Sequence, residues 1–170
     1  MTFVSAQFTT FPTSYIDANG AADIGLSLAF FTMKSFDFEM RNKETSMYNA
    51  INWFEIPAAD FDRAVDFYHK VLETAIRKEI FGGMPNGIFV TDGEGAVGGA
   101  IVKGEGYTPT TSGSVVYLNA KTPDYLDRVL ARVEPAGGKV LLPKTHIGAP
   151  GFIALILDTE GNRVGLHSPN

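Results

Sequence analysis

INWFEIPAADFDRAVDFYHKVL, residues 51–72, is the stretch of sequence that decides the fold. Residues 51–56 are mostly apolar and are followed by Pro57, which is typical of a short, half-buried strand. Asp60 can then cap a helix, because its carboxylate accepts hydrogen bonds from the first free N–H groups. Beyond it, apolar residues recur at steps of three and four along one stripe: Phe61, Ala64, Val65, Tyr68, Val71, Leu72 and Ala75. The stretch therefore predicts one strand followed by one amphipathic helix.

A weaker copy of this unit follows at an offset of 65 positions, where residues 127–130 repeat the pattern of residues 62–65. Residues 98–102 fall on 163–167 at the same offset. Thr122 and Pro123 suit the start of a second helix, with a capping hydroxyl and a proline in the first turn. Further strands are predicted at residues 88–90, 96–102, 115–118, 139–142, 151–157 and 162–167. The pattern predicts two β-α-β-β-β modules, at about 48–103 and 113–170, joined by a Gly-, Thr- and Ser-rich linker.

Composition limits the classes of function. Hydrophobic residues make up 45% and charged residues 19% of the 170 residues, which indicates one compact globular domain. The net charge of −5 provides no basic face for nucleic acid or for an anionic membrane. No apolar run approaches the roughly 20 residues of a membrane span. The lack of cysteine excludes disulfides, thiolate metal sites and a cysteine nucleophile, and it fits a reducing, cytoplasmic compartment.

The first 46 residues differ from the rest of the chain. They carry scattered phenylalanines without a sustained helix or strand period. No Lys or Arg precedes Lys34, so a secretory signal is not predicted. Two interpretations stay open: an irregular N-terminal extension, residues 1–46, before a domain at 47–170, or a biological start at Met47.

Several of these segments resemble the vicinal oxygen chelate superfamily, the group of glyoxalases, bleomycin-resistance proteins and extradiol dioxygenases. Within it, the branch of lactoylglutathione-lyase-related proteins is most similar. The resemblance covers residues 48–170 and implies an α+β fold in which two βαβββ modules curl mixed sheets into a cup. It also implies a small-molecule ligand and a homodimer. The segments that carry it are Asn52-Trp53-Phe54-Glu55-Ile56-Pro57, Asp60-Phe61-Asp62-Arg63-Ala64, Phe67-Tyr68, Gly137-Gly138-Lys139-Val140 and residues 157–168.

The resemblance also implies a divalent metal in the cup, held by one residue on each module's first strand and one on each last strand. The first-strand ligand of the family stands seven residues before the aspartate that opens the helix. Those positions are Trp53, before Asp60, and Tyr117, before Asp124; the last-strand positions are Ala100 and Gly165. None of the four offers a carboxylate or imidazole. We therefore expect no metal and no other cofactor, with a divalent metal as the alternative.

Strand alternation selects the residues that would line the cup. It places Trp53 and Glu55 on one face of the first strand and Tyr117 and Asn119 on the matching face of the second module. Trp53, Tyr117, Asn119 and Arg163 are the expected ligand-binding residues. Glu55, His167 and, by family analogy, His146 in a loop at the mouth are the candidate catalytic residues. Each has a plainer interpretation, as a core, interface or solvated surface residue.

Three functions remain possible from the sequence. The first is a metal-independent protein that binds or transforms a small organic molecule in the cup. The second is a metal-dependent lyase, isomerase or dioxygenase that uses displaced ligands such as Glu55, His146 and His167. The third is a non-catalytic protein that sequesters a small molecule, as bleomycin-resistance proteins do. Whether the chain is an enzyme stays open at this point.

Overall fold

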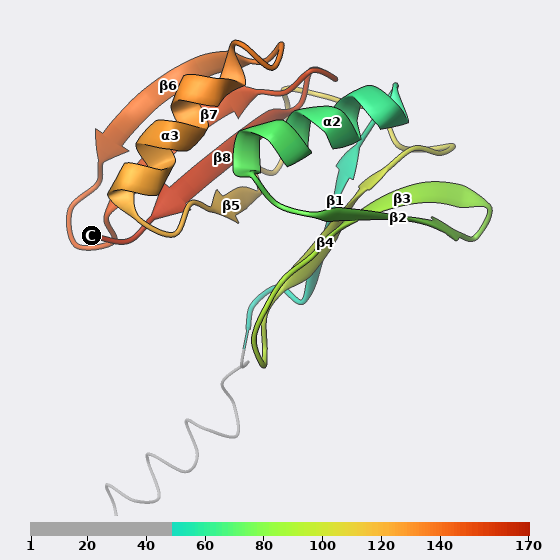
Figure 1. Ribbon diagram of the computed structural model, residues 1–170, viewed down its shortest axis with the longest axis horizontal. Helices are drawn as coiled ribbons and strands as arrows, with labels where there is room; N and C mark the ends of the chain where they lie inside the picture. Colours follow the sequence, from blue (N-terminus) through green and yellow to red (C-terminus); the bar gives the residue numbers. More distant parts are fainter. Residues whose placement is uncertain (1–48) are drawn as a thin grey trace, which may run out of the picture. The chain divides into compact units, whose positions relative to one another are not determined.

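The computed structural model describes residues 49–170, which form two successive βαβββ modules (Figure 1). The proposed extension at 1–46 lies outside the described residues. The first module consists of β1 (Trp53–Pro57), α2 (Phe61–Leu72), β2 (Ile76–Phe81), β3 (Met84–Phe89) and β4 (Gly98–Val102). The second consists of β5 (Tyr117–Asn119), α3 (Pro123–Val133), β6 (Lys139–His146), β7 (Phe152–Leu157) and β8 (Arg163–Ser168).

Each module builds its own four-stranded mixed sheet. The strand order is β1-β4-β3-β2 in the first sheet and β5-β8-β7-β6 in the second. In both, the first strand pairs in parallel with the last, and the remaining pairs are antiparallel. The predicted α+β class and the duplicated module are therefore confirmed. Figure 1 shows both helices on one side of the sheets, so no helix within residues 49–170 covers the opposite faces, which are called the helix-free faces below.

Both helices begin where the sequence predicts. The side chains of Asp60 and Thr122 accept from the backbone N–H groups of Arg63 and Tyr125, which caps α2 and α3 respectively. The apolar stripe of α2 packs in the core, where Tyr68 and Val71 have no exposed surface. The helices also contact each other, which joins the two modules into one core.

The first module contains a strand, β2, that the sequence did not predict, and β3 and β6 begin or end at other residues than predicted. A strand was predicted only at residues 88–90, but β3 already begins at Met84. Gly82 and Gly83, with φ values of 57° and 80°, form the two-residue hairpin turn before it. Strand β6 extends to His146 instead of ending at Leu142, although it contains Pro143. A proline is tolerated there because β6 is an edge strand whose register with β7 shifts between Leu142 and Thr145.

Both ends of α2 are bound by side chains of the second module. At its C-terminal end, the Tyr125 hydroxyl donates to the Leu72 carbonyl, and Arg132 Nε donates to the Val71 carbonyl at 2.9 Å. At its N-terminal end, the Glu160 carboxylate accepts from the backbone N–H groups of Ala59 and Asp60 at 3.1 and 2.7 Å. The second module thus satisfies backbone groups that a helix cannot satisfy by itself.

The β7–β8 turn, residues 158–162, is the centre of this junction. The buried Asp158 carboxylate accepts from the Tyr68 hydroxyl at 2.7 Å, and Asn162 Nδ2 donates to the Pro57 carbonyl at 2.8 Å. Arg63 forms a two-pronged ion pair with Glu160, at 2.8 and 3.0 Å. Burial raises the pKa of Tyr68 well above 10.0, and the neighbouring Asp158 charge and hydrogen bond add to this shift. A turn expected only to connect two strands therefore fastens the two modules together.

Among the described residues, no helix is long and apolar enough to cross a membrane.

Candidate functional site

The first strand of each module presents alternate residues to opposite faces of its sheet, as predicted. On β1, Ile56 is buried in the core beneath α2, whereas Trp53 is 43% exposed on the helix-free face. Glu55 shares that exposed face with Trp53. On β5, Leu118 is buried and Tyr117 is 46% exposed. The helix-free faces therefore carry the residues that the alternation assigned to the cup.

On each of these faces, an aromatic ring lies against a glycine of the last strand. Trp53 pairs in register with Gly98, and a Cβ added at Gly98 would lie 2.9 Å from the indole ring. Tyr117 pairs with Gly165, and a Cβ added there would lie 2.4 Å from the phenol ring. Both contacts are closer than real Cβ atoms approach other atoms, so the rings occupy the space of the missing side chains.

The register changes which residues of the two modules correspond. The second helix is capped by Thr122, not by Asp124, so Tyr117 stands five residues before its cap, as Glu55 does before Asp60. The strand pairings agree, because Glu55 faces Ala100 and Tyr117 faces Gly165. Tyr117 is therefore the counterpart of Glu55, not of Trp53. Counting to Asp124 was misleading because that residue lies inside the first turn of α3.

The side chains do not fit the metal that the family resemblance implies. The last-strand positions are Ala100, fully buried, and Gly165, covered by Tyr117. Within residues 49–170, no three His, Asp or Glu side chains are grouped so that they could hold a metal ion. His146 and His167, two of the ligands that the metal-dependent alternative would use, lie on opposite faces of the second sheet. His146 pairs with Phe152, whereas His167 pairs with the next residue, Ile153. The residues present therefore do not form a site for the divalent metal of the family.

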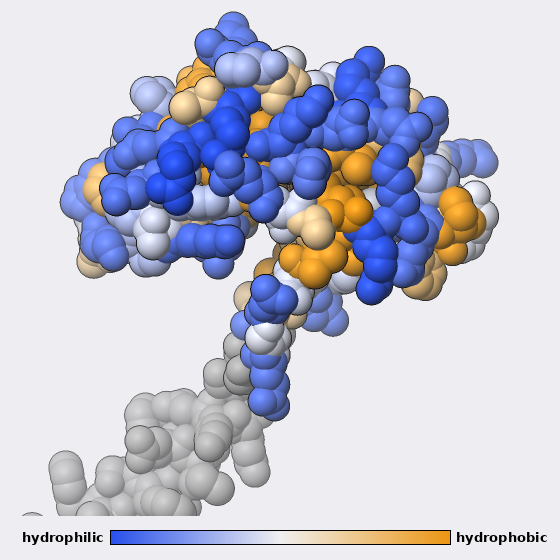
Figure 2. All heavy atoms as spheres, viewed as in Figure 1, coloured by the Kyte–Doolittle hydropathy of each residue, from blue (hydrophilic) through white to orange (hydrophobic). Residues whose placement is uncertain are grey.

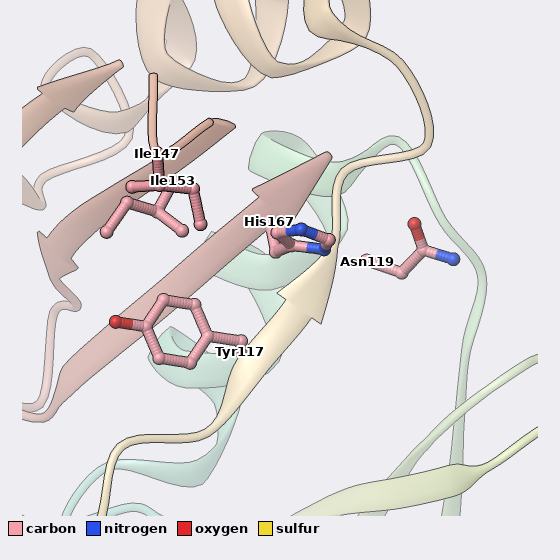
Figure 3. Close-up of a pocket in the computed structure, with 5 residues that line it drawn as sticks. All are labelled: Tyr117, Asn119, Ile147, Ile153 and His167. Atoms are coloured by element: carbon pink, nitrogen blue, oxygen red, sulfur yellow. The ribbon is translucent and has the colours of Figure 1, made fainter. Parts of the chain in front are cut away.

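A pocket of about 390 Å³ opens on the helix-free face of the second sheet. Figure 3 shows the Tyr117 ring lying over β8, with Ile147 and Ile153 beside it, whereas the Asn119 amide extends from β5 away from these side chains. The volume lies within the usual range for small-molecule sites, and the lining is mostly apolar. The lining residues are Tyr117, Asn119, Ile147, Ile153 and His167.

Two polar groups of this pocket have defined hydrogen-bonding roles. His167 Nε2 lies 2.9 Å from the Pro150 carbonyl oxygen, which can only accept, so Nε2 carries the proton. In the neutral ring, Nδ1 is then a free acceptor. Asn119 Oδ1 accepts from the Lys121 backbone N–H at 2.8 Å, which leaves the Asn119 amide nitrogen as a donor. Asn119 and His167 are register partners on neighbouring strands.

His146 does not lie in this pocket or in a loop. It is the last residue of β6 and pairs with Phe152, whereas Ile153, the residue after Phe152, lines the pocket. The His146 ring contacts the Phe152 ring at a centroid distance of 4.9 Å, on the sheet face that carries the helix. The sequence interpretation placed His146 at the mouth because it ended β6 too early.

Glu55 lies in the first module as part of a small hydrogen-bonded group. Its Oε1 accepts from the Trp53 indole N–H at 3.3 Å, and its Oε2 accepts from the Tyr107 hydroxyl at 2.5 Å. The hydrogen bond to Glu55 is the main cause that raises the pKa of Tyr107 above 10.0, and partial burial and the Glu55 charge add to it. Tyr107 belongs to the linker between the modules, and nothing in its sequence context marked it as a partner of β1.

Arg163 lies on the same face of β8 as His167, but it lines a different cavity. That smaller cavity has a volume of about 90 Å³ and is shared with Glu55. The structure thus divides the seven candidate residues among three places. Tyr117, Asn119 and His167 share the larger pocket, whereas Glu55 and Arg163 share the smaller one, with Trp53 beside Glu55. His146 stands apart.

Comparison with known proteins agrees with this architecture. Residues 50–166 match the model of the Glyoxalase/Bleomycin resistance protein/Dioxygenase superfamily. The chain belongs to this superfamily, and the expected resemblance is confirmed. No curated protein matches the sequence.

Solved structures share the fold at low sequence identity. A glyoxalase/bleomycin resistance protein from Albidiferax ferrireducens T118 is similar with a TM-score of 0.58 and 16% identity, over 72% of this chain and 100% of that one. The fosfomycin resistance protein FosX from Listeria monocytogenes gives 0.53 and 12%, over 73% and 94%. A single-residue mutant of glyoxalase I from Zea mays gives 0.52 and 18%, over 68% and 45%. At these identities the likeness concerns the fold alone.

Proposed function

We propose that this protein binds a small, largely apolar organic molecule on the helix-free face of its second sheet, and does so without a divalent metal. The pocket of about 390 Å³ carries the proposal, because it combines apolar walls with one ring acceptor, His167 Nδ1. The ligand class that suits it is a compact molecule with one hydroxyl or N–H group. Whether binding leads to a reaction depends on His167, the basic group in the pocket.

Metal independence is supported by the contact between Tyr117 and Gly165. A Lewis-acid mechanism of the glyoxalase type needs ligands that converge on one ion, with distances of about 2.0–2.2 Å for Zn²⁺. Glycine at position 165 offers no ligand, and the Tyr117 ring fills the space above it. The metalloenzyme alternative would need His146 and His167 to reach one ion from opposite faces of the same sheet.

Purified protein should therefore contain no stoichiometric Zn²⁺, Ni²⁺, Mn²⁺ or Fe²⁺ and should show no glyoxalase I activity on the methylglyoxal–glutathione adduct. Elemental analysis after expression in metal-supplemented medium tests the first part, and a standard spectrophotometric assay tests the second. About one metal equivalent per chain, lost in Glu55→Gln or His167→Ala, would establish the metalloenzyme alternative instead.

Binding in the pocket should depend on a hydroxyl group in the ligand. Benzyl alcohol is expected to bind about threefold to tenfold more tightly than toluene, since a neutral hydrogen bond contributes about 0.5–1.5 kcal/mol. His167→Ala should remove this preference, and Tyr117→Ala should weaken both ligands. Ligand-observed NMR titrations measure the affinities. His69→Ala, which changes an exposed histidine on α2, is the matched control and should keep the preference. Equal affinities in the wild type would contradict the role given to His167.

We further infer a cytoplasmic homodimer. Figure 2 shows apolar surface gathered on the part of the molecule formed by the first sheet. Ile80 and Phe81, on the edge strand β2, are 69% and 58% exposed, and exposed apolar edges favour association. Sedimentation at micromolar concentration should give a dimer, and Phe81→Lys should shift it toward the monomer. A clean 18.4 kDa species for the wild type would argue against the dimer.

A further inference from the structure

The smaller cavity, of about 90 Å³, lies between the two modules. Its walls come from β1, from the segment between β4 and β5, and from the start of β8. It shares no lining residue with the larger pocket. The Tyr117 ring lies over Gly165, between Arg163 and His167 along β8, and so separates the two. The cavity is therefore a site of its own, independent of the function proposed above.

Arg163 reaches this cavity without a strong partner. Its Nη2 donates to the Gly113 carbonyl at 3.4 Å, a long hydrogen bond, and its Nε is enclosed by the protein without an acceptor among residues 49–170. None of the ion pairs formed within residues 49–170 includes Arg163. A ligand would therefore bind the terminal Nη groups, of which Nη1 forms no hydrogen bond within residues 49–170. Charged donors that lack strong acceptors favour a ligand with negatively charged oxygens.

The opposite charge lines the same cavity. Glu55 accepts one hydrogen bond on each carboxylate oxygen, from Trp53 and from Tyr107. Each oxygen can accept a further hydrogen bond, because an ionised carboxylate has about four acceptor positions. The Glu55 carboxylate and the Arg163 guanidinium are not within ion-pair distance of each other in the described part of the chain.

The two charges together decide the class of ligand. A simple anion at Arg163 would be repelled by Glu55, and a simple cation at Glu55 would be repelled by Arg163. A molecule with both charges a few atoms apart satisfies both residues. The cavity is also small, about three times the volume that one water molecule occupies in the liquid. Serine hydroxyls, from Ser112 and Ser114, complete a polar lining.

We propose that this cavity binds a small zwitterion of the α-amino acid type, with its carboxylate on Arg163 and its ammonium group on Glu55. The proposal concerns binding only and includes no reaction.

Glycine is the probe, and the full chain is the protein to test. Calorimetric titration measures affinity, and tryptophan fluorescence reports the location, because Trp53 is the only tryptophan of the chain and donates to Glu55. Glycine should give saturable heat and change the Trp53 emission. N-acetylglycine, which lacks the ammonium group, and glycinamide, which lacks the carboxylate, should each bind at least tenfold more weakly.

Variants test the two anchors separately. Arg163→Gln and Glu55→Gln should each weaken glycine binding at least tenfold. The matched controls are Arg77→Gln and Glu79→Gln, which alter an ion pair on β2 away from the cavity, and they should bind glycine as the wild type does. The absence of saturable heat with glycine would overturn the proposal, and so would equal affinity for N-acetylglycine, which would indicate an anion site. The ligand series on the wild type decides the question even if a variant fails to fold.

Discussion

Replacing Asp158 by alanine should lower the free energy of unfolding by about 3–5 kcal/mol, because it leaves several buried donors without an acceptor. The Asp158 residue is only 3% exposed. Its carboxylate accepts from the Tyr68 hydroxyl and from Asn162 Nδ2 at 2.7 and 2.9 Å. It also accepts from the backbone N–H groups of Glu160 and Asn162 at 2.9 and 2.8 Å. Denaturant unfolding monitored by circular dichroism measures the loss.

Tyr68→Phe is the matched control for this prediction. It removes a single hydroxyl from the same group and keeps the ring packed against Phe67 and Phe89. The expected loss is about 1–2 kcal/mol, since one donor is deleted and the carboxylate keeps its other donors. If Asp158→Ala costs no more than Tyr68→Phe, the turn is not what fastens the modules together.

Glu160→Gln should destabilise the protein by about 2–3 kcal/mol at pH 7, through the loss of charge at a helix N-terminus and at a buried carboxylate. The Glu160 side chain is fully buried, whereas the Arg63 side chain is 51% exposed, so solvent screens part of the ion pair. Most of the expected loss of stability therefore comes from weaker hydrogen bonds between residue 160 and the backbone N–H groups of Ala59 and Asp60, at the start of α2.

The same residue predicts how stability changes with pH. Burial alone would raise the pKa of Glu160, but the hydrogen bonds from Arg63, Asp60 and Thr159 and the Arg63 charge outweigh it and lower the pKa below 4.5. A lowered carboxylate pKa stabilises the fold above the unfolded value of 4.5, and this stability is lost as the pH falls through the folded pKa. The difference between wild type and Glu160→Gln should therefore shrink below pH 4.5. Glu94→Gln, at an exposed position, is the matched control.

The fold could be predicted largely from residues 51–72 and their repeat, because both helices carry a capping residue and a clear apolar stripe. The strand β2 left no such signal. Arg77, Lys78 and Glu79 are consecutive charged residues on an edge strand, so neither face shows an apolar alternation. The limits of β6 were missed for a related reason: Pro143 normally ends a strand, and an edge position with a register shift tolerates it.

The candidate site could be predicted only where it depends on strand alternation. Alternation placed Tyr117, Asn119 and His167 on one face, and the structure brings them into one pocket. The apolar wall formed by Ile147 and Ile153 depends on the β6–β7 loop and on the pairing of β7 with β8, which sequence periodicity does not report. The division of Glu55 and Arg163 into a second cavity depends in turn on how the linker packs between the modules.

The contact between Tyr117 and Gly165 also restricts which side chains can occupy the two positions together. Glutamate at position 165 alone would collide with the ring, and a small residue at 117 alone would uncover the glycine without adding a ligand. A mutational survey should find larger residues at 165 only together with smaller ones at 117. A glutamate at position 165 of β8 therefore needs a smaller residue at position 117 to make room for its side chain.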